Sequence, residues 1–268
     1  MELRGLRLMN LKTLKYEVRD RVAYVTFTTP DRLNSITEER LDDLNAVMDS
    51  VESDTTIHAM TVTGQGRAFC VGDDLDLLKR AFDELDYFES FLRRFNDVIL
   101  RLERLEVPVV AVVNGIARAG GFELALACDL ILIADEAKFG DNHTHVGVMP
   151  GGGATQRLPR RIGPQAAKEL IWSARWLSGS QAAACGLAFK SVPLEKLYDE
   201  CEALLAGFRD KPRAVLSVVK KTIQAGESLS IEDGIDLEIR TFIDYTRNEP
   251  RVREMVWASL KNGEESKP

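Results

Sequence analysis

The sequence PVVAVVNGIARAGGFELALACDLILIA, at residues 108–134, contains the clearest fold signal in the chain. Its first apolar run, residues 108–113, is unbroken, as expected of a strand that is buried on both faces. A glycine turn and a short helix over residues 122–128 follow, and a second apolar run covers residues 130–134. The order strand, turn, helix, strand predicts a right-handed βαβ unit.

The segments that precede this stretch continue the alternation of strands and helices. Residues 16–27 alternate in hydrophobicity, which predicts two short strands joined by a turn at Arg19 and Asp20. A further strand is expected at residues 59–63, and a long helix from about residue 83 to residue 105. This half of the chain is therefore predicted to form a layered α/β core.

The segment that follows Gly163 is almost entirely helical in its pattern. The predicted helices cover residues 164–173, 180–186, 195–209, 212–225, 231–246 and 250–260. We therefore predict an N-terminal tail at 1–13, an α/β core at 14–200 and a C-terminal helical segment at 201–268.

The composition narrows the class of protein. The chain has 268 residues, 45% of them hydrophobic, which is enough to bury a full core. A net charge of −7 gives no basic nucleic-acid-binding surface. No apolar run approaches the ~20 residues that span a membrane, and residues 1–10 do not resemble a signal peptide. We expect a cytoplasmic protein with no nucleic-acid and no membrane partner.

The cysteines and histidines give no metal signature. The four cysteines match neither a zinc pattern nor CxxC spacing, and the three histidines are too few and too clustered for an obvious site. Cys70, Cys128 and Cys185 have apolar neighbours, so we expect buried thiols. The sequence predicts no metal and no separate cofactor.

Glycine turns that follow predicted strands and open helices are the first candidates for chemistry. A helix N-terminus exposes backbone N–H groups and the positive end of the helix dipole. Two such turns lying side by side could direct two N–H groups at one oxygen, as an oxyanion hole requires. Ordinary tight turns explain the spacing equally well.

Glu123 lies in the helix that one of these turns opens, between apolar neighbours. A carboxylate in such surroundings is costly unless it is paired or functional. Burial would raise its pKa, which suits general acid–base catalysis near neutral pH. The alternative is that Glu123 faces solvent on an amphipathic helix.

Several motifs follow one another along the chain. They are Asn34-Ser35-Ile36, Ala68-Phe69-Cys70-Val71-Gly72-Asp73-Asp74-Leu75, residues 108–115, Gly120-Gly121-Phe122-Glu123-Leu124-Ala125, Cys128-Asp129, Phe139-Gly140, residues 147–158 and Ala184-Cys185-Gly186-Leu187-Ala188. Over roughly residues 14–260, this ordered set resembles the crotonase (enoyl-CoA hydratase/isomerase) superfamily.

The resemblance implies a fold of repeated ββα units, with a C-terminal helical segment that mediates trimerisation. The partners it implies are an acyl-CoA thioester and further copies of the chain in a homotrimer or homohexamer, with coenzyme A present only as part of the substrate. It places the oxyanion-hole amides on Val71 and Gly120. It also matches Glu123 to the first catalytic glutamate of the hydratases.

Other residues are candidates for substrate binding. Arg32 lies where the family contacts the nucleotide end of coenzyme A, and Lys261 resembles a basic residue that reaches a neighbouring subunit's ligand; both could equally be ordinary solvated charges. Asp73 could touch the substrate or could cap the following helix. Ala68 and Gly121, which lie within the same motifs, complete the candidate set.

The segment after Phe139-Gly140 departs from the family pattern. Hydratases carry a second glutamate where ungapped spacing here places His143. Imidazole titrates near neutrality, so His143 could replace that carboxylate, with Asp141 to orient it. His143 and His145 could instead only line the pocket or pack a loop.

Three functions are compatible with these residues. The first is a hydratase or isomerase acting on an acyl-CoA, with Glu123 as acid and base. The second is carbon–carbon bond cleavage by a decarboxylase or retro-Claisen hydrolase that uses His143 and Asp141. The third is a non-catalytic acyl-CoA-binding protein, which a solvent-facing Glu123 would favour.

Overall fold

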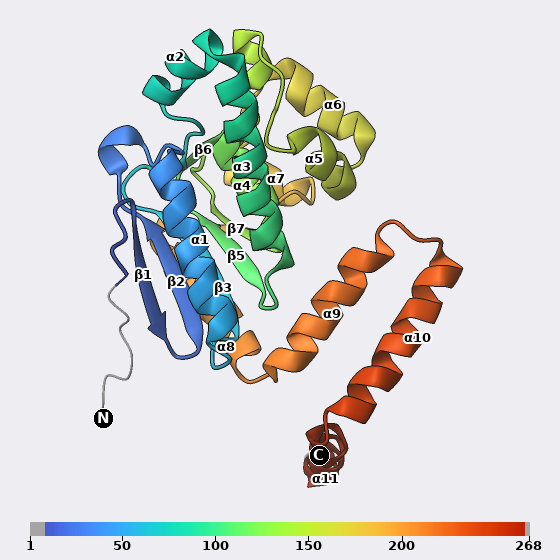
Figure 1. The fold of residues 1–268 in the computed structure, drawn as a ribbon. Coiled ribbons are helices and arrows are strands. Elements are labelled where there is room, and N and C mark those ends of the chain that lie inside the picture. Colours follow the sequence, from blue (N-terminus) through green and yellow to red (C-terminus); the bar gives the residue numbers. More distant parts are fainter. Residues whose placement is uncertain (1–8, 266–268) are drawn as a thin grey trace. The chain divides into compact units, whose positions relative to one another are not determined.

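The main sheet contains, as neighbours, the two strands predicted around residues 108–134 (Figure 1). The computed structural model describes residues 9–265, with side chains for residues 9–258 and Leu260. The strands run in the order β1, β2, β3, β5, β7, β9; β1 is antiparallel to β2 and the others are parallel. They are β1 (Leu14–Arg19), β2 (Val22–Phe27), β3 (Ala59–Gly64), β5 (Val109–Val113), β7 (Leu130–Ala134) and β9 (Lys190–Val192). Every residue of β5 is buried, as its unbroken apolar run predicts.

A second, three-stranded parallel sheet runs in the order β4, β6, β8. Its strands are β4 (Ala68–Cys70), β6 (Ile116–Arg118) and β8 (Phe139–Gly140). Each follows one long strand of the main sheet, β3, β5 and β7 respectively, and each precedes a helix. This confirms the repeated ββα pattern. The short strands themselves were not predicted, because two or three residues give no measurable alternation.

Helices α1 (Glu38–Ser53) and α3 (Leu85–Arg104) pack on each other and lie in front of the main sheet in Figure 1. Helix α8 (Leu197–Arg209) contacts β3, β5 and β7. The remaining helices of this unit are α2 (Leu75–Asp83), α4 (Gly120–Leu126), α5 (Ala154–Ile162), α6 (Pro164–Ser173) and α7 (Gly179–Ala184).

Two local predictions need correction. The first turn lies at Asp20 and Arg21, one residue later than expected, and both residues have positive φ, 47° and 64°. The helix expected from residue 83 is preceded by a separate helix, α2, because Asp74 caps a new start and Leu77 and Ala81 give α2 its own buried face.

Cys185 corrects a third expectation. Cys70 and Cys128 are buried, as predicted, but Cys185 is exposed. It follows the short helix α7, which buries only Gly179 and Ala182, so the apolar letters around Cys185 do not mark a core position.

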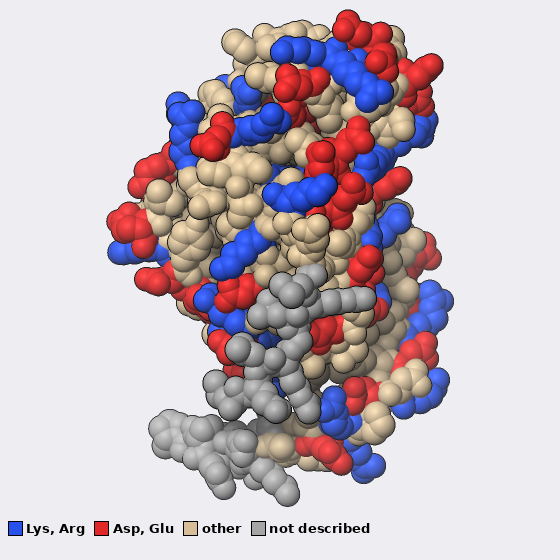
Figure 2. Space-filling view, turned by 60° about the vertical axis from the view of Figure 1, so that its left-hand side comes forward, with Lys and Arg blue, Asp and Glu red and all other residues tan. Residues whose placement is uncertain are grey.

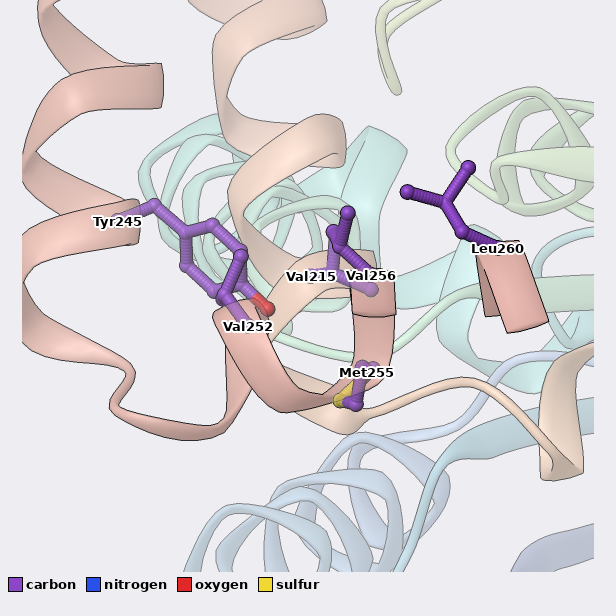
Figure 3. Close-up of a pocket in the computed structure, with 6 residues that line it drawn as sticks. All are labelled: Val215, Tyr245, Val252, Met255, Val256 and Leu260. Carbon is purple, nitrogen blue, oxygen red and sulfur yellow. The ribbon is translucent and has the colours of Figure 1, made fainter. Parts of the chain in front are cut away.

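The chain divides into two compact units between Lys211 and Pro212. The predicted boundary at residue 200 falls within α8. The second unit consists of α9 (Arg213–Gly226), α10 (Ile231–Asn248) and α11 (Arg251–Glu265), and α9 packs on α10. A pocket of about 380 Å³ lies among these helices, and Figure 3 shows side chains from all three around it.

The second unit exposes many large apolar side chains. Among its described side chains only Ser217 is buried. Those exposed on α10 recur at helical spacing and are Ile231, Ile235, Ile239, Phe242 and Ile243.

Charges of both signs are mixed on one face of the molecule. Figure 2 shows Lys and Arg interspersed with Asp and Glu over the face in view. Within residues 9–265, no helix is long and apolar enough to cross a membrane.

Candidate active site

Two glycine turns from separate ββα units touch each other. Gly72 follows β4, and Gly120 is the first residue of α4. A Cβ atom on Gly72 would lie 2.9 Å from the backbone nitrogen of Gly120, and Gly72 has a φ of +87°. Both the close approach and the backbone conformation therefore require glycine. The two turns thus lie side by side, and Val71 adjoins the contact.

Ala119 holds the second turn in a strained conformation, with φ 48° and ψ −127°. A residue with a Cβ rarely adopts this conformation, which costs roughly 1–3 kcal/mol. Two hydrogen bonds enforce it, since Ala119 N–H donates to Asp141 O at 3.0 Å and Ala119 O accepts from Glu123 N–H at 3.0 Å. The turn therefore ends with the Gly120 N–H in the first turn of α4, outside the helical hydrogen-bond ladder.

Gly121 joins α4 directly to the small sheet. A Cβ atom on Gly121 would lie 2.1 Å from the carbonyl oxygen of Cys70 in β4. No side chain fits there, so Gly121 brings the start of α4 against the end of β4.

Glu123 is buried, with 1% of its surface exposed. Its Oε1 accepts hydrogen bonds from Gly152 N–H at 2.8 Å and Ala154 N–H at 3.0 Å. The solvent-facing alternative is therefore wrong. Burial raises the pKa of Glu123 to about 7, although the charge of His143 and the two amide hydrogen bonds oppose the rise.

Gly152 fixes where the Glu123 carboxyl group lies. A Cβ atom on Gly152 would lie 2.5 Å from Glu123 Oε2 and 2.4 Å from Cε1 of Phe95. Neither Gly152 nor Ala154 is among the site residues predicted from the sequence. The run of three glycines at 151–153 is the signal that could have found them.

His143 and Asp141 form a hydrogen-bonded pair after β8. Asp141 is completely buried, and its Oδ1 lies 3.0 Å from Nδ1 of His143. Between them Asn142 has a φ of 56°, which turns the chain so that both side chains face the same way. The carboxylate accepts the Nδ1 proton, which leaves Nε2 as the free nitrogen of the ring.

The pKa of His143 reflects all of its acidic neighbours. Burial by itself lowers this pKa, but the hydrogen bond to Asp141 and the charges of Asp141, Glu123 and Asp73 outweigh burial and raise it overall. One imidazole from the loop after β8 thus interacts with carboxyl groups from three segments of the chain.

Asp73 lies beside the contact between the two turns. Its Oδ1 is buried, has no hydrogen-bond partner among the described residues, and lies 3.5 Å from the position that a Gly120 Cβ would occupy. Burial raises the pKa of Asp73 to about 6, against the opposing charge of His143. The helix-capping alternative is wrong, because the α2 cap is Asp74, whose Oδ1 accepts from Asp76 N–H at 3.1 Å.

The other candidates lie in different surroundings. Arg32 forms an ion pair with Asp74 at 3.1 Å, and 59% of its side chain is exposed. The carbonyl of Ala68 accepts a hydrogen bond from Asn34 Nδ2 at 2.8 Å. His145 is exposed on a 3-10 turn. The side chain of Lys261 lies outside the described residues.

Within the described part of the chain, no group of three or more His, Cys, Asp or Glu residues has the geometry to hold a metal ion.

Comparison with known proteins agrees with this architecture. The family model for enoyl-CoA hydratase/isomerase matches residues 17–259. The chain is 32% identical over 239 residues to a short-chain-enoyl-CoA hydratase of Clostridium acetobutylicum, covering 87% of this chain and 89% of that protein. It is 30% identical over 226 residues to a probable mitochondrial enoyl-CoA hydratase of Dictyostelium discoideum, covering 84% and 80%.

A solved structure shows the same fold. The enoyl-CoA hydratase of Bacillus anthracis matches with a TM-score of 0.89 at 27% identity, covering 94% of this chain and 97% of that one. The chain belongs to the enoyl-CoA hydratase/isomerase family of the crotonase superfamily.

Proposed function

We propose that this protein is a hydratase or isomerase that acts on an acyl-CoA and uses Glu123 as acid and base. The observation that carries the proposal is the position of Glu123. It is buried on the helix that Gly120 begins, and two backbone amides hold one of its oxygens. The second oxygen, Oε2, accepts no hydrogen bond from the described residues and is left for a substrate proton.

The turns at Gly72 and Gly120 would supply the oxyanion hole. In this proposal the N–H groups of Val71 and Gly120 donate to the thioester oxygen as it gains enolate character. The contact between the turns brings these two residues close together, and a site held rigidly in advance stabilises developing charge without reorganisation. The strain at Ala119 supports this view, because strained backbone clusters at functional sites.

The pair of His143 and Asp141 would act as the second proton carrier, in place of a second glutamate. Hydration joins the oxygen of water to C3 and a proton to C2 of the enoyl group. One side chain takes a proton from the water, and another delivers a proton to C2. Glu123 has a pKa of about 7, and the charges of Glu123 and His143 affect each other's pKa, so in this proposal the two groups share these steps near neutral pH.

The hydrogen bond between Asp141 and His143 also favours a second candidate, carbon–carbon bond cleavage. An imidazole held by a carboxylate can remove a proton from water, which then attacks a ketone carbon at C3 of the acyl chain. The C2–C3 bond breaks, the electron pair enters the thioester enolate, and Glu123 protonates C2. The third function, binding without catalysis, loses its support because Glu123 is buried.

One assay separates the two reactions. The protein is incubated in turn with crotonyl-CoA, a 3-enoyl-CoA and a β-ketoacyl-CoA, and the products are identified by mass. We expect hydration or isomerisation of the first two substrates and an activity loss of about 10²-fold or more in Glu123→Gln. Turnover of the β-ketoacyl-CoA alone would reject the hydratase or isomerase assignment, and full activity of Glu123→Gln would remove Glu123 from the mechanism.

The second unit would assemble copies of the chain into a homotrimer or homohexamer. The apolar side chains of α10 are exposed in the single chain, and large exposed apolar patches mark interaction surfaces. A neighbouring copy that covered them would supply the burial that this unit lacks by itself.

A further inference from the structure

Asp73 and Asp74 are adjacent in sequence but differ in how their carboxyl groups are used. Asp74 caps α2 with Oδ1, and its Oδ2 accepts from Ser35 Oγ at 3.0 Å and from Arg32 Nη1 at 3.1 Å. Asp73 Oδ1 is buried, and the described residues offer it no donor. A buried acceptor without a partner costs about 1–3 kcal/mol. Asp74 is thus explained by the fold, whereas Asp73 is not.

The backbone holds Asp73 firmly. Ile36 N–H donates to Gly72 O at 2.8 Å, and Asp74 N–H donates to Ile36 O at 3.0 Å, so both neighbours of Asp73 are tied to one residue. These bonds fix the backbone at Asp73 and therefore the point from which its side chain extends. Its Oδ1 lies 3.5 Å from the position that a Gly120 Cβ would occupy, next to the proposed oxyanion hole.

The charges around Asp73 indicate what could bind there. The charge of His143 lowers the pKa of Asp73 against the effect of burial, and His143 already donates to Asp141. The carboxyl groups of Asp73, Glu123 and Asp141 all raise the pKa of this single imidazole. An acyl group with a second carboxylate would be repelled, whereas one that carries a hydrogen-bond donor would satisfy Asp73.

We propose that Asp73 is a specificity-determining residue that accepts a hydrogen bond from a hydroxyl or amino group on the acyl chain, about two bonds from the thioester carbonyl. This inference rests on the proposed acyl-CoA function. The position follows from the geometry, because Gly120 would hold the carbonyl oxygen and Asp73 Oδ1 lies beside Gly120. A site with a buried polar group rejects an analogue that lacks the complementary polar group.

The test is a binding series in the full chain. Dissociation constants are measured by calorimetry for 3-hydroxypropionyl-CoA, β-alanyl-CoA and butyryl-CoA, which have acyl groups of equal size, and for succinyl-CoA. All proteins carry Glu123→Gln so that turnover does not intervene. We expect the hydroxyl and amino esters to bind at least about 10-fold more tightly than butyryl-CoA, and succinyl-CoA to bind most weakly.

Variants at position 73 attribute the preference. Asp73→Ala should reduce the ratio between the hydroxyl ester and butyryl-CoA to about one, while its butyryl-CoA affinity stays unchanged or rises. Asp73→Asn should keep part of the preference for the hydroxyl ester, because an amide oxygen still accepts, and should lose the preference for the amino ester. Asp76→Ala, which removes an exposed carboxylate on α2, is the control and should leave every ratio unchanged.

The outcomes distinguish this inference from the function on which it rests. Equal binding of the three matched esters, or a preference that survives Asp73→Ala, would overturn the role of Asp73 while leaving an acyl-CoA enzyme in place. Failure to bind any CoA ester would reject the proposed function itself. The urea midpoint of the Asp73→Ala protein is compared with that of the protein carrying Glu123→Gln alone. Equal midpoints would show that a loss of binding does not come from a loss of folding.

Discussion

Gly152 N–H donates a 2.8 Å hydrogen bond to Oε1 of Glu123, although 29 positions separate the two residues. The bond joins the loop before α5 to the helix that Gly120 begins. Gly152 thereby fixes which carboxylate oxygen remains for chemistry. The catalytic role proposed for Glu123 depends on this loop as much as on its own helix.

Gly152→Ala should therefore impair catalysis more than folding. The added methyl group would collide with the Glu123 carboxyl group and with the ring of Phe95. We expect a loss in kcat/KM of about 10²-fold, because small misplacement of a reacting group is expensive. The cost in unfolding free energy should be about 1–3 kcal/mol, measured in urea.

Gly207→Ala is the matched control for this substitution. A Cβ atom there meets no atom within 4 Å, and Gly207 lies inside α8. It should leave kcat/KM unchanged and raise stability by about 0.5–1 kcal/mol. If Gly152→Ala behaved in the same way, the close packing of Gly152 against the Glu123 carboxyl group would not matter for the reaction.

The stability of the protein should depend on pH through Glu123. Its pKa is about 7 in the folded chain against an ordinary value of 4.5, so the folded state binds this proton more tightly than the unfolded state. The contribution of this proton to the free energy of unfolding is complete below about pH 4.5 and is lost as pH rises through 7. Glu123→Gln does not titrate at this position and so does not lose this contribution. The unfolding free energy of the variant minus that of the wild type should therefore rise by roughly 1–3 kcal/mol from pH 5 to pH 8.

Urea unfolding of both proteins at several pH values measures this difference. Taking the difference cancels the contribution of titrating groups that lie far from Glu123 and are present in both proteins. A difference that did not vary across the window would mean that the pKa of Glu123 is not raised.

Asp141→Asn should lower the pKa of His143. The substitution removes a carboxylate that accepts from the imidazole at 3.0 Å, while the steric shape is nearly unchanged. Titration of the imidazole by NMR should show the shift, and the corresponding limb of the pH–rate profile should move in the same direction. His145→Asn is the control, because His145 is exposed, and should leave the pKa of His143 in place. An unshifted imidazole in Asp141→Asn would contradict the pair.

The strain at Ala119 predicts a stabilising substitution. Glycine tolerates the positive φ of 48°, so Ala119→Gly should raise the unfolding free energy by up to about 1 kcal/mol, the relief of strain less the added chain entropy. The freed turn should lower kcat several-fold. Arg21→Gly relieves a φ of 64° in the turn between β1 and β2, and should raise stability without changing kcat. Equal kcat in the wild type and Ala119→Gly would mean that the strain does not serve the reaction.

The apolar face of α10 predicts the assembly. Light scattering of the wild type should give three or six times the chain mass of 29.9 kDa. Ile235→Asp together with Ile239→Asp should shift the particle to the mass of one chain, because buried unpaired charges are costly. Asp236→Asn on the same helix should leave the mass unchanged. A wild type that ran as a single chain would reject the proposed trimer or hexamer.

The order of the long helices and strands could be predicted from the sequence alone. Each of them buries one or both faces, and this burial gives its sequence a recognisable pattern of hydrophobic residues. Residues 108–113 and 130–134 read as buried strands and became β5 and β7, and the helix expected at 164–173 has those bounds as α6. Glu123 was identifiable from its apolar neighbours, and the two glycine turns from their places after strands. The separate helix α2 was not predicted because it depends on the cap at Asp74. The first turn lies one residue later than predicted. The exposure of Cys185 depends on how α7 packs, which its apolar neighbours in sequence do not show.

Which of these residues meet depends on how the chain packs. Gly152 reaches Glu123, and Gly72 touches Gly120, through contacts between segments that hydrophobic periodicity does not link. The pair of His143 and Asp141 depends on the local turn at Asn142, which periodicity does not show either. The different uses of Asp73 and Asp74 are also decided by the tertiary structure, since either could have capped α2. A local pattern records how each segment is buried. Hydrogen bonds and close approaches between segments depend on how the segments pack, and packing set the chemistry of this site.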